Sequence, residues 1–237
     1  MQTLLATVAP LMYVLAAVLI ALAMQSGRAT PRRAGAILTA LAVVAHAALV
    51  IGQMQVAGGF TADFFSALSI VSLVVVALML MAGTRFPLLE ILPAALPGAA
   101  LMLVLQAAFG PEPRALALSD PRAEVHVIAS LLAYSVLLIA ALNAIFLYVQ
   151  HQLLHRHRSS RLIGVLPPLT TMEALLFQLI AAGWLLLTVS LGSGLLFVDN
   201  LFAQHLVHKT VLSILAWLIF GVLLFGRWRF GWRGLRV

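Results

Sequence analysis

The sequence predicts an all-α protein, a polytopic bundle of about seven transmembrane helices. Hydrophobic residues make up 63% of the 237 residues, charged residues only 9%, and the mean hydropathy is +1.11. Apolar runs of about 20 residues, the length that crosses a bilayer, recur with only short polar breaks between them. Nothing is left over for a soluble domain, so we expect residues 1–237 to form a single integral membrane domain.

The apolar runs and the loop charges together predict a topology. The runs place the spans at 4–24, 34–56, 64–82, 86–109, 123–150, 171–198 and 205–226. Eleven of the 14 basic residues follow odd-numbered spans, and basic residues collect in cytoplasmic loops. We therefore expect a multi-pass protein of a bacterial inner membrane, with the N-terminus outside and the C-terminus cytoplasmic. This alternation accounts for the net charge of +7, so no nucleic-acid partner is required.

The first span is predicted to be a retained helix. Its basic residues come after the apolar stretch of "MQTLLATVAPLMYVLAAVLIALAMQSGR", whereas a cleaved signal peptide carries them before it. The chain has no cysteine. This excludes a disulfide framework, a CxxC redox motif and self-attachment of a c-type haem.

The second and fourth spans carry the next informative residues. His46 lies near the middle of 34–56, where an ionisable group is costly unless it has a partner or faces a cavity. Two interpretations stay open, a neutral imidazole bonded across helices, for example to Asn143, or a ligand. In 86–109, Pro93 and Pro97 stand one turn apart and predict a kink or break, which we interpret as a packing irregularity.

The fifth span carries a candidate ligand, and the sixth carries residues with predicted structural roles. His126 lies at the outer end of 123–150, after a proline-rich external loop, and its position suits either a solvated histidine or a ligand. Thr170 and Glu173 have capping-box spacing at the start of 171–198, which predicts a structural role for this acid. Ser190 and Gly194 form a small-xxx-small pair that allows close helix approach.

The seventh span begins with three polar residues, His205, His208 and Lys209. The two histidines are three residues apart and share one helix face, with the lysine one turn from His205. Neutral imidazole is a common ligand of haem iron and a cation can meet a propionate, so the group suits either a haem edge or a polar collar at the membrane surface.

Other chemistry is not supported by the sequence. His151, His155 and His157 have a plausible metal spacing, but Arg156 and Arg158 lie between and beside them, so a solvated basic loop is the better interpretation. The motifs of metalloproteases, P-loop enzymes and serine hydrolases are missing from the sequence.

Two segments resemble a known family. "EVHVIASLLAYSVLLIAALNAIFLY" is similar to the span that follows the external histidine in the cytochrome c assembly family, the haem-handling membrane proteins of the CcsA and CcmC type. "GSGLLFVDNLFAQHLVHKTVLSILAWLIF" resembles the family's tryptophan-rich segment, although tryptophans are absent between Phe197 and Thr210. The overall resemblance is to the shorter HemX-like and YpjD-like inner-membrane branch, over most of residues 34–232.

The resemblance implies a haem-binding protein without bond-making chemistry. His126 with His205 or His208 would supply axial nitrogens to a haem near the outer leaflet, and Lys209 and Arg122 would neutralise its propionates. His46 would be a second ligand site or part of an entry path.

Partners in cytochrome biogenesis are also implied. Two alternatives remain, a regulatory or scaffold protein of the HemX-like kind and an accessory subunit of a transport system, neither with stable haem. The transport alternative depends on a polar path made by His46, Asn143, Gln106 and Glu90.

Overall fold

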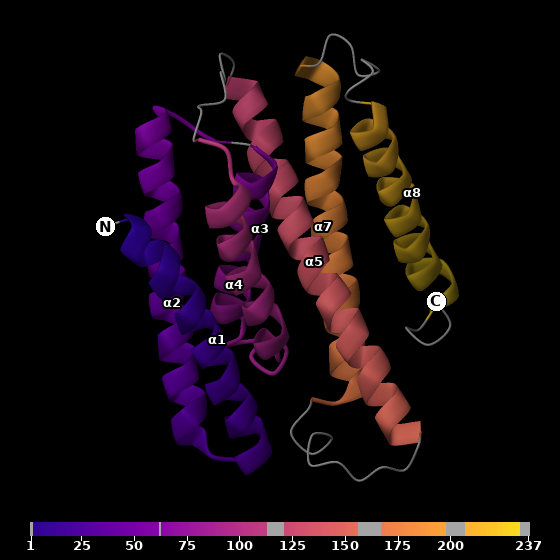
Figure 1. Ribbon diagram of the computed structural model, residues 1–237. Helices are drawn as coiled ribbons and strands as arrows, with labels where there is room; N and C mark the ends of the chain where they lie inside the picture. The colour runs from indigo at the N-terminus through magenta and orange to yellow at the C-terminus, as the bar shows by residue number, and fades with distance from the viewer. Residues whose placement is uncertain (1, 62, 113–120, 156–166, 198–206, 233–237) are drawn as a thin grey trace. The chain divides into compact units, whose positions relative to one another are not determined.

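The computed structural model describes residues 2–61, 63–112, 121–155, 167–197 and 207–232, and the regular structure in these residues is helical. The helices are α1 (Gln2–Ser26), α2 (Ala29–Ala57), α3 (Phe64–Ala82), α4 (Leu92–Phe109), α5 (Pro121–His155), α7 (Leu169–Phe197) and α8 (Val207–Phe230) (Figure 1). Within the described residues, seven helices are long and apolar enough to cross a membrane. The predicted all-α polytopic bundle is confirmed.

The helix bounds differ from the predicted spans mainly at the fourth and fifth helices. The span expected over 86–109 begins as a helix only at Leu92, with Pro93 in its first turn and turns before it. A proline lacks the N–H that a helix interior needs but loses nothing in the first turn, so Pro93 starts this helix and only Pro97 lies inside it. The helix expected over 123–150 covers Pro121–His155, longer than a bilayer requires.

The chain divides into two compact units. The first comprises residues 1–117 and 142–172, and the second comprises residues 118–141 and 173–237. In the first unit, α1 packs against α2 and α4, and α3 packs against α2 and α4. Gly35 shows how closely α1 and α2 approach, because a Cβ there would lie 2.5 Å from Ile20 Cγ1. Small residues allow this proximity between membrane helices.

Local capping fixes the short connection between α2 and α3. Gly58 adopts a left-handed conformation with φ of 76° and ends α2, and its N–H donates to the carbonyl of Gln55. Asp63 begins α3, where its carboxylate accepts hydrogen bonds from the backbone N–H groups of Phe65 and Ser66 at 3.1 and 3.0 Å. These caps bring the C-terminal end of α2 and the N-terminal end of α3 to the same end of the bundle.

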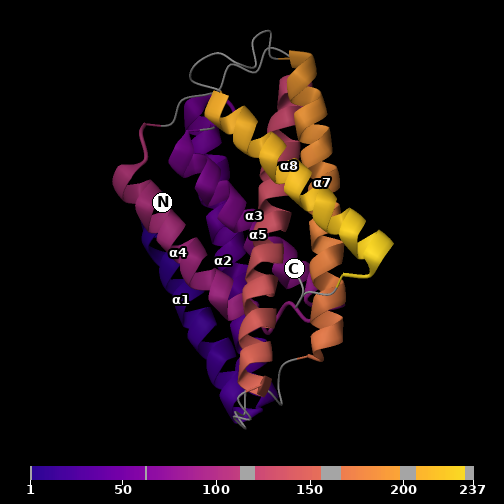
Figure 2. The same cartoon turned by 90° about the vertical axis from the view of Figure 1, so that its right-hand side faces the viewer.

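In the second unit, α7 and α8 lie side by side and are joined by a tryptophan pair (Figures 1 and 2). The rings of Trp184 and Trp217 stack with their centroids 5.4 Å apart. Trp184 Nε1 donates to the Trp217 carbonyl at 3.0 Å, and Trp217 Nε1 donates to Thr188 Oγ1 at 2.8 Å. Each indole thus bonds to the opposite helix, which satisfies its N–H within the apolar bundle.

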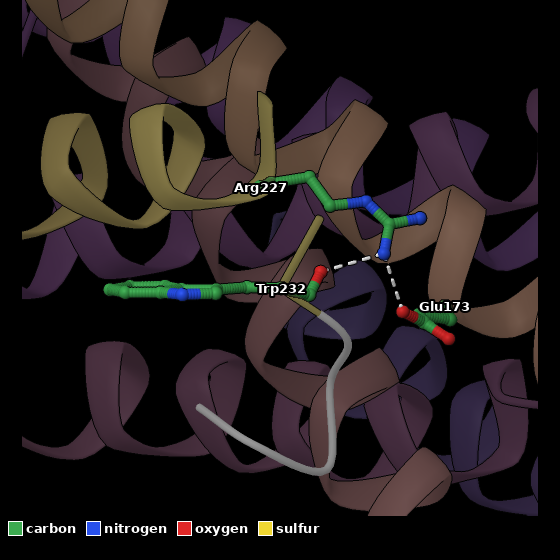
Figure 3. A network of polar contacts seen from close by, with 3 residues as sticks. All are labelled: Glu173, Arg227 and Trp232. Carbon is green, nitrogen blue, oxygen red and sulfur yellow. Dashed lines mark hydrogen bonds and ion pairs between the residues drawn. The ribbon is translucent and has the colours of Figure 1, made fainter. Parts of the chain in front are cut away.

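A second contact between the same helices lies at the C-terminal end of α8 (Figure 3). Arg227 Nη1 donates to Glu173 Oε1 and to the Trp232 carbonyl, both at 2.7 Å. Its guanidinium carbon lies 4.6 Å from the centre of the Phe177 ring. Glu173 was predicted to form a capping box with Thr170, but α7 begins at Leu169, so Thr170 lies inside the helix and not at its cap. Glu173 forms an ion pair with Arg227.

Candidate functional site

His126 lies on α5 in the second unit and is held by the backbone of α7. Its Nδ1 is 2.8 Å from the carbonyl oxygen of Ser190. A carbonyl oxygen only accepts, so Nδ1 carries the hydrogen in this bond. In the neutral imidazole the lone pair then belongs to Nε2, for which the described residues supply no hydrogen-bond partner. The contact selects one tautomer and leaves one nitrogen available.

Serine hydroxyls bond to the backbone carbonyls of both His126 and Ser190. Ser130 Oγ donates to the carbonyl of His126 at 2.7 Å, and therefore accepts from Ser190 Oγ at 2.6 Å. Ser193 Oγ donates to the Ser190 carbonyl at 2.9 Å. This serine cluster, Ser130, Ser190 and Ser193, adds a second link between α5 and α7 through the bond of Ser130 to Ser190.

Gly194 lets the imidazole ring lie against α7. A Cβ at this position would be 3.1 Å from His126 Cε1 and 3.2 Å from Nδ1. Both distances are shorter than ordinary van der Waals contact, so a larger residue would have to displace the ring. The small-xxx-small pair of Ser190 and Gly194 was predicted to serve helix approach, and here it accommodates the side chain of His126.

The other residues predicted for the outer haem site are only partly described. His205 lies outside the described residues. His208 and Lys209 belong to the first turn of α8, and Arg122 belongs to the first turn of α5, but their side chains lie outside the described part of the chain. Their predicted roles therefore stay predictions.

His46 is fully buried in the first unit and both of its ring nitrogens have partners. Nδ1 lies 3.2 Å from the Tyr13 hydroxyl, and Nε2 lies 2.8 Å from Ser69 Oγ. The suggested partner Asn143 instead donates to the Met172 carbonyl at 3.0 Å. Coordination of iron by His46 would require the loss of one of its two hydrogen bonds, and its predicted role in haem handling stays a prediction.

The remaining polar residues considered for a transport path have local partners. Glu90 accepts from Arg32 at 2.6 Å, and Gln106 donates to Gln53 Oε1 at 2.8 Å.

The described part of the chain contains no group of three or more metal-ligating side chains. His151 and His155 contact each other with ring centroids 5.4 Å apart, and His157 lies outside the described residues.

Sequence reasoning missed the partners that position the histidines. The bond from His126 goes to a backbone carbonyl, which every residue carries, so no side-chain pattern could have indicated it. A weak signal existed for His46, because Ser66, Ser69 and Ser72 recur at helical spacing on α3 and place hydroxyls on one face.

Comparison with known proteins agrees with this architecture. The family model described as "Cytochrome C assembly protein" matches residues 34–237. The chain belongs to the cytochrome c assembly family. It is 34% identical to the inner membrane protein YpjD of Escherichia coli K12 over 210 residues, which cover 87% of this chain and 79% of that protein.

A second relative from another genus is more distant. A 28.8 kDa protein in the nifR3-like 5' region of Azospirillum brasilense is 29% identical over 113 residues, covering 47% of this chain and 42% of that protein. No solved structure gives a significant match. Together with the apolar helices, the family and the YpjD relationship identify this chain as a multi-pass bacterial inner-membrane protein.

Proposed function

We propose that this member of the cytochrome c assembly family binds haem near the outer leaflet and presents or relays it to partners in cytochrome biogenesis. The family membership supports the haem part of this proposal. The N-out, C-in topology that puts His126 at the outer face is part of the same proposal. Its role is binding and presentation, without bond making.

The contact of His126 Nδ1 with the Ser190 carbonyl is the observation that carries the proposal. Histidines that bind metals usually donate the second ring N–H to a carboxylate or a backbone carbonyl, which orients the ring and raises the basicity of the ligating nitrogen. His126 makes this kind of bond through Nδ1 to Ser190. Its Nε2 is therefore the nitrogen that would hold the haem iron.

A second histidine and two cations would complete the proposed haem site. His205 or His208 would supply the second imidazole, and Lys209 and Arg122 would neutralise the propionates. When bound, the haem would supply an iron that the imidazole nitrogens can coordinate. The chain contributes ligating nitrogens, compensating charge and an apolar surrounding.

The test is an absorption spectrum of the detergent-purified protein after haem supplementation, oxidised and reduced. The wild type should give a six-coordinate, bis-imidazole spectrum at stoichiometric haem. His126→Ala should lose it, and so should the double variant His205→Ala/His208→Ala. His151→Ala serves as the matched control, because this histidine lies on α5 as well but is not proposed as a ligand.

Two results would contradict the proposal. One is a wild type that binds no stoichiometric haem, and the other is a haem spectrum that survives in both histidine variants. Either would favour the regulatory or scaffold alternative, in which the same helices serve contacts with a protein partner. Flux of solutes in liposomes would then separate a scaffold from a transport subunit.

A further inference from the structure

The bundle of α1 to α4 contains a buried hydrogen-bonded group centred on His46. Tyr13 on α1, His46 on α2 and Ser69 on α3 are each 0% exposed. The imidazole bonds to both hydroxyls, at 3.2 and 2.8 Å. Burying three polar side chains within membrane helices is costly, and an ionisable one there is a candidate for function.

A second buried group lies on the same helices. Gln106 on α4 is 8% exposed, and its Nε2 lies 2.8 Å from Gln53 Oε1 on α2 and 3.2 Å from Ser66 Oγ on α3. Ser66 itself is 7% exposed. This amide therefore ties three helices together, as the imidazole does in the first group.

The two groups follow one another along shared helix faces. Ser66 and Ser69 are three residues apart on α3, and His46 and Gln53 are seven apart on α2, so each pair occupies one face. We name the six residues Gln53, Gln106, Ser66, Ser69, His46 and Tyr13 the polar file. It passes from Gln53 to Tyr13 between four helices of one unit.

One end of the polar file lies at an end of the bundle. Gln53 is close to the C-terminal end of α2, Ser66 is next to the Asp63 cap of α3, and Gln106 is close to the C-terminal end of α4. The other end is Tyr13, in the middle of α1. The polar file therefore leads from the membrane surface to the centre of the bundle.

We propose that the polar file admits water and exchanges protons between this end of the bundle and His46. The amides of Gln53 and Gln106 and the hydroxyls of Ser66 and Ser69 now bond one another or His46. A water that inserts between them would replace these bonds with bonds to itself, at little cost in hydrogen-bond energy. In one exchange, a solvent hydron adds to the imidazole nitrogen that carries none, and the hydron on the other nitrogen then leaves for the water. The imidazole is neutral before and after, its tautomer is reversed, and a second exchange restores it.

The charged and titratable groups around the polar file lie mainly at the bundle ends. Asp63 caps α3 at the entrance, whereas Arg32 and Glu90 pair near the start of α2 and before α4. Tyr13 faces the imidazole from α1. Among these four groups, only Tyr13 bonds to His46. The His46 imidazole is therefore the group inside the polar file to which a hydron binds.

Hydrogen exchange at the His46 ring tests this proposal. Protein labelled with ¹⁵N-histidine is placed in lipid nanodiscs and transferred to D₂O, and loss of the His46 ring N–H signal is followed by NMR. The signal is assigned from its absence in His46→Gln. In the wild type, the ring N–H should exchange at least about tenfold faster than the protected backbone amides of α2.

Two variants and a control locate the route. Gln106→Leu removes the amide that joins the helices at the entrance, and it should slow the exchange about tenfold. Ser66→Ala is the milder change if Gln106→Leu fails to fold, and it should also slow the exchange. Gln150→Leu is the matched control, since Gln150 is buried in the same unit but its Nε2 donates to the Pro167 carbonyl.

The expected pattern is fast exchange in the wild type and in Gln150→Leu, and slow exchange in the two variants of the file. A ring N–H as protected as the α2 backbone in the wild type would overturn the proposal. So would slowing of equal size in Gln150→Leu, because that would reflect general packing. None of these outcomes depends on whether the protein binds haem.

Discussion

Gly194→Ala offers a sharp test of how α7 positions His126. The new Cβ would lie 3.1 Å from Cε1 and 3.2 Å from Nδ1 of the imidazole, whereas ordinary contact begins near 3.4 Å. The ring must therefore move by a few tenths of an ångström, away from a carbonyl bond that is now 2.8 Å long. Loss of such an outer partner typically costs a metal site about 10- to 100-fold in affinity.

We expect Gly194→Ala to weaken haem binding about tenfold, the lower end of this range, because the bond is bent rather than removed. That corresponds to about 1.4 kcal/mol of binding free energy. The assay is a haem titration of the detergent-solubilised protein, read from the absorption spectrum. Gly192→Ala is the matched control, since a Cβ at Gly192 on the same helix would meet nothing within 4 Å.

The comparison of these two alanine variants decides whether α7 positions the imidazole of His126. Unchanged affinity in Gly194→Ala would refute the positioning role of α7. An equal loss in Gly192→Ala would also refute it, because the effect would then come from the helix backbone and not from contact with the imidazole.

Three further predictions concern stability and topology. His46→Leu leaves the buried Tyr13 hydroxyl unpaired and should lower the free energy of unfolding in mixed micelles by about 1–3 kcal/mol. The double variant with Tyr13→Phe should lose less than the sum of the two single losses, and strict additivity would contradict the contact. Glu173→Gln should cost at most about 1 kcal/mol in the same assay, because both partners of its ion pair with Arg227 are partly exposed; a larger loss would give this pair a greater role. Single cysteines added at each end of the cysteine-free chain should react with an impermeant maleimide only at the N-terminus in spheroplasts, and labelling of the C-terminus would reverse the topology.

The membrane fold could be predicted from the sequence because the bilayer restricts which backbone structures can form in it. Uninterrupted apolar runs must become helices in a bilayer, where each backbone group needs an internal partner. The run over 64–82 matches α3 at both ends. The error at the fourth helix came from counting Phe86 to Ile91 as part of the span, although Pro93 in the first turn marks the true start.

The partners of the histidines could not be predicted in this way. To pair His46 with Tyr13 and Ser69, one must know which faces of α1, α2 and α3 meet. These helices carry apolar residues all round, so the sequence pattern does not distinguish the faces. His126 was selected from its place at the outer end of a span and from the family resemblance. No side-chain pattern indicates that a backbone carbonyl of α7 bonds to its Nδ1.

The stacked tryptophans give the second unit an optical signal of its own. Trp184 and Trp217 are two of only four tryptophans in the chain, and their rings lie 5.4 Å apart across α7 and α8. Indoles so close couple electronically, and their emission and near-ultraviolet circular dichroism depend on that overlap. If α8 moves relative to α7 when a ligand or partner binds, unlabelled protein will report the movement through its own fluorescence.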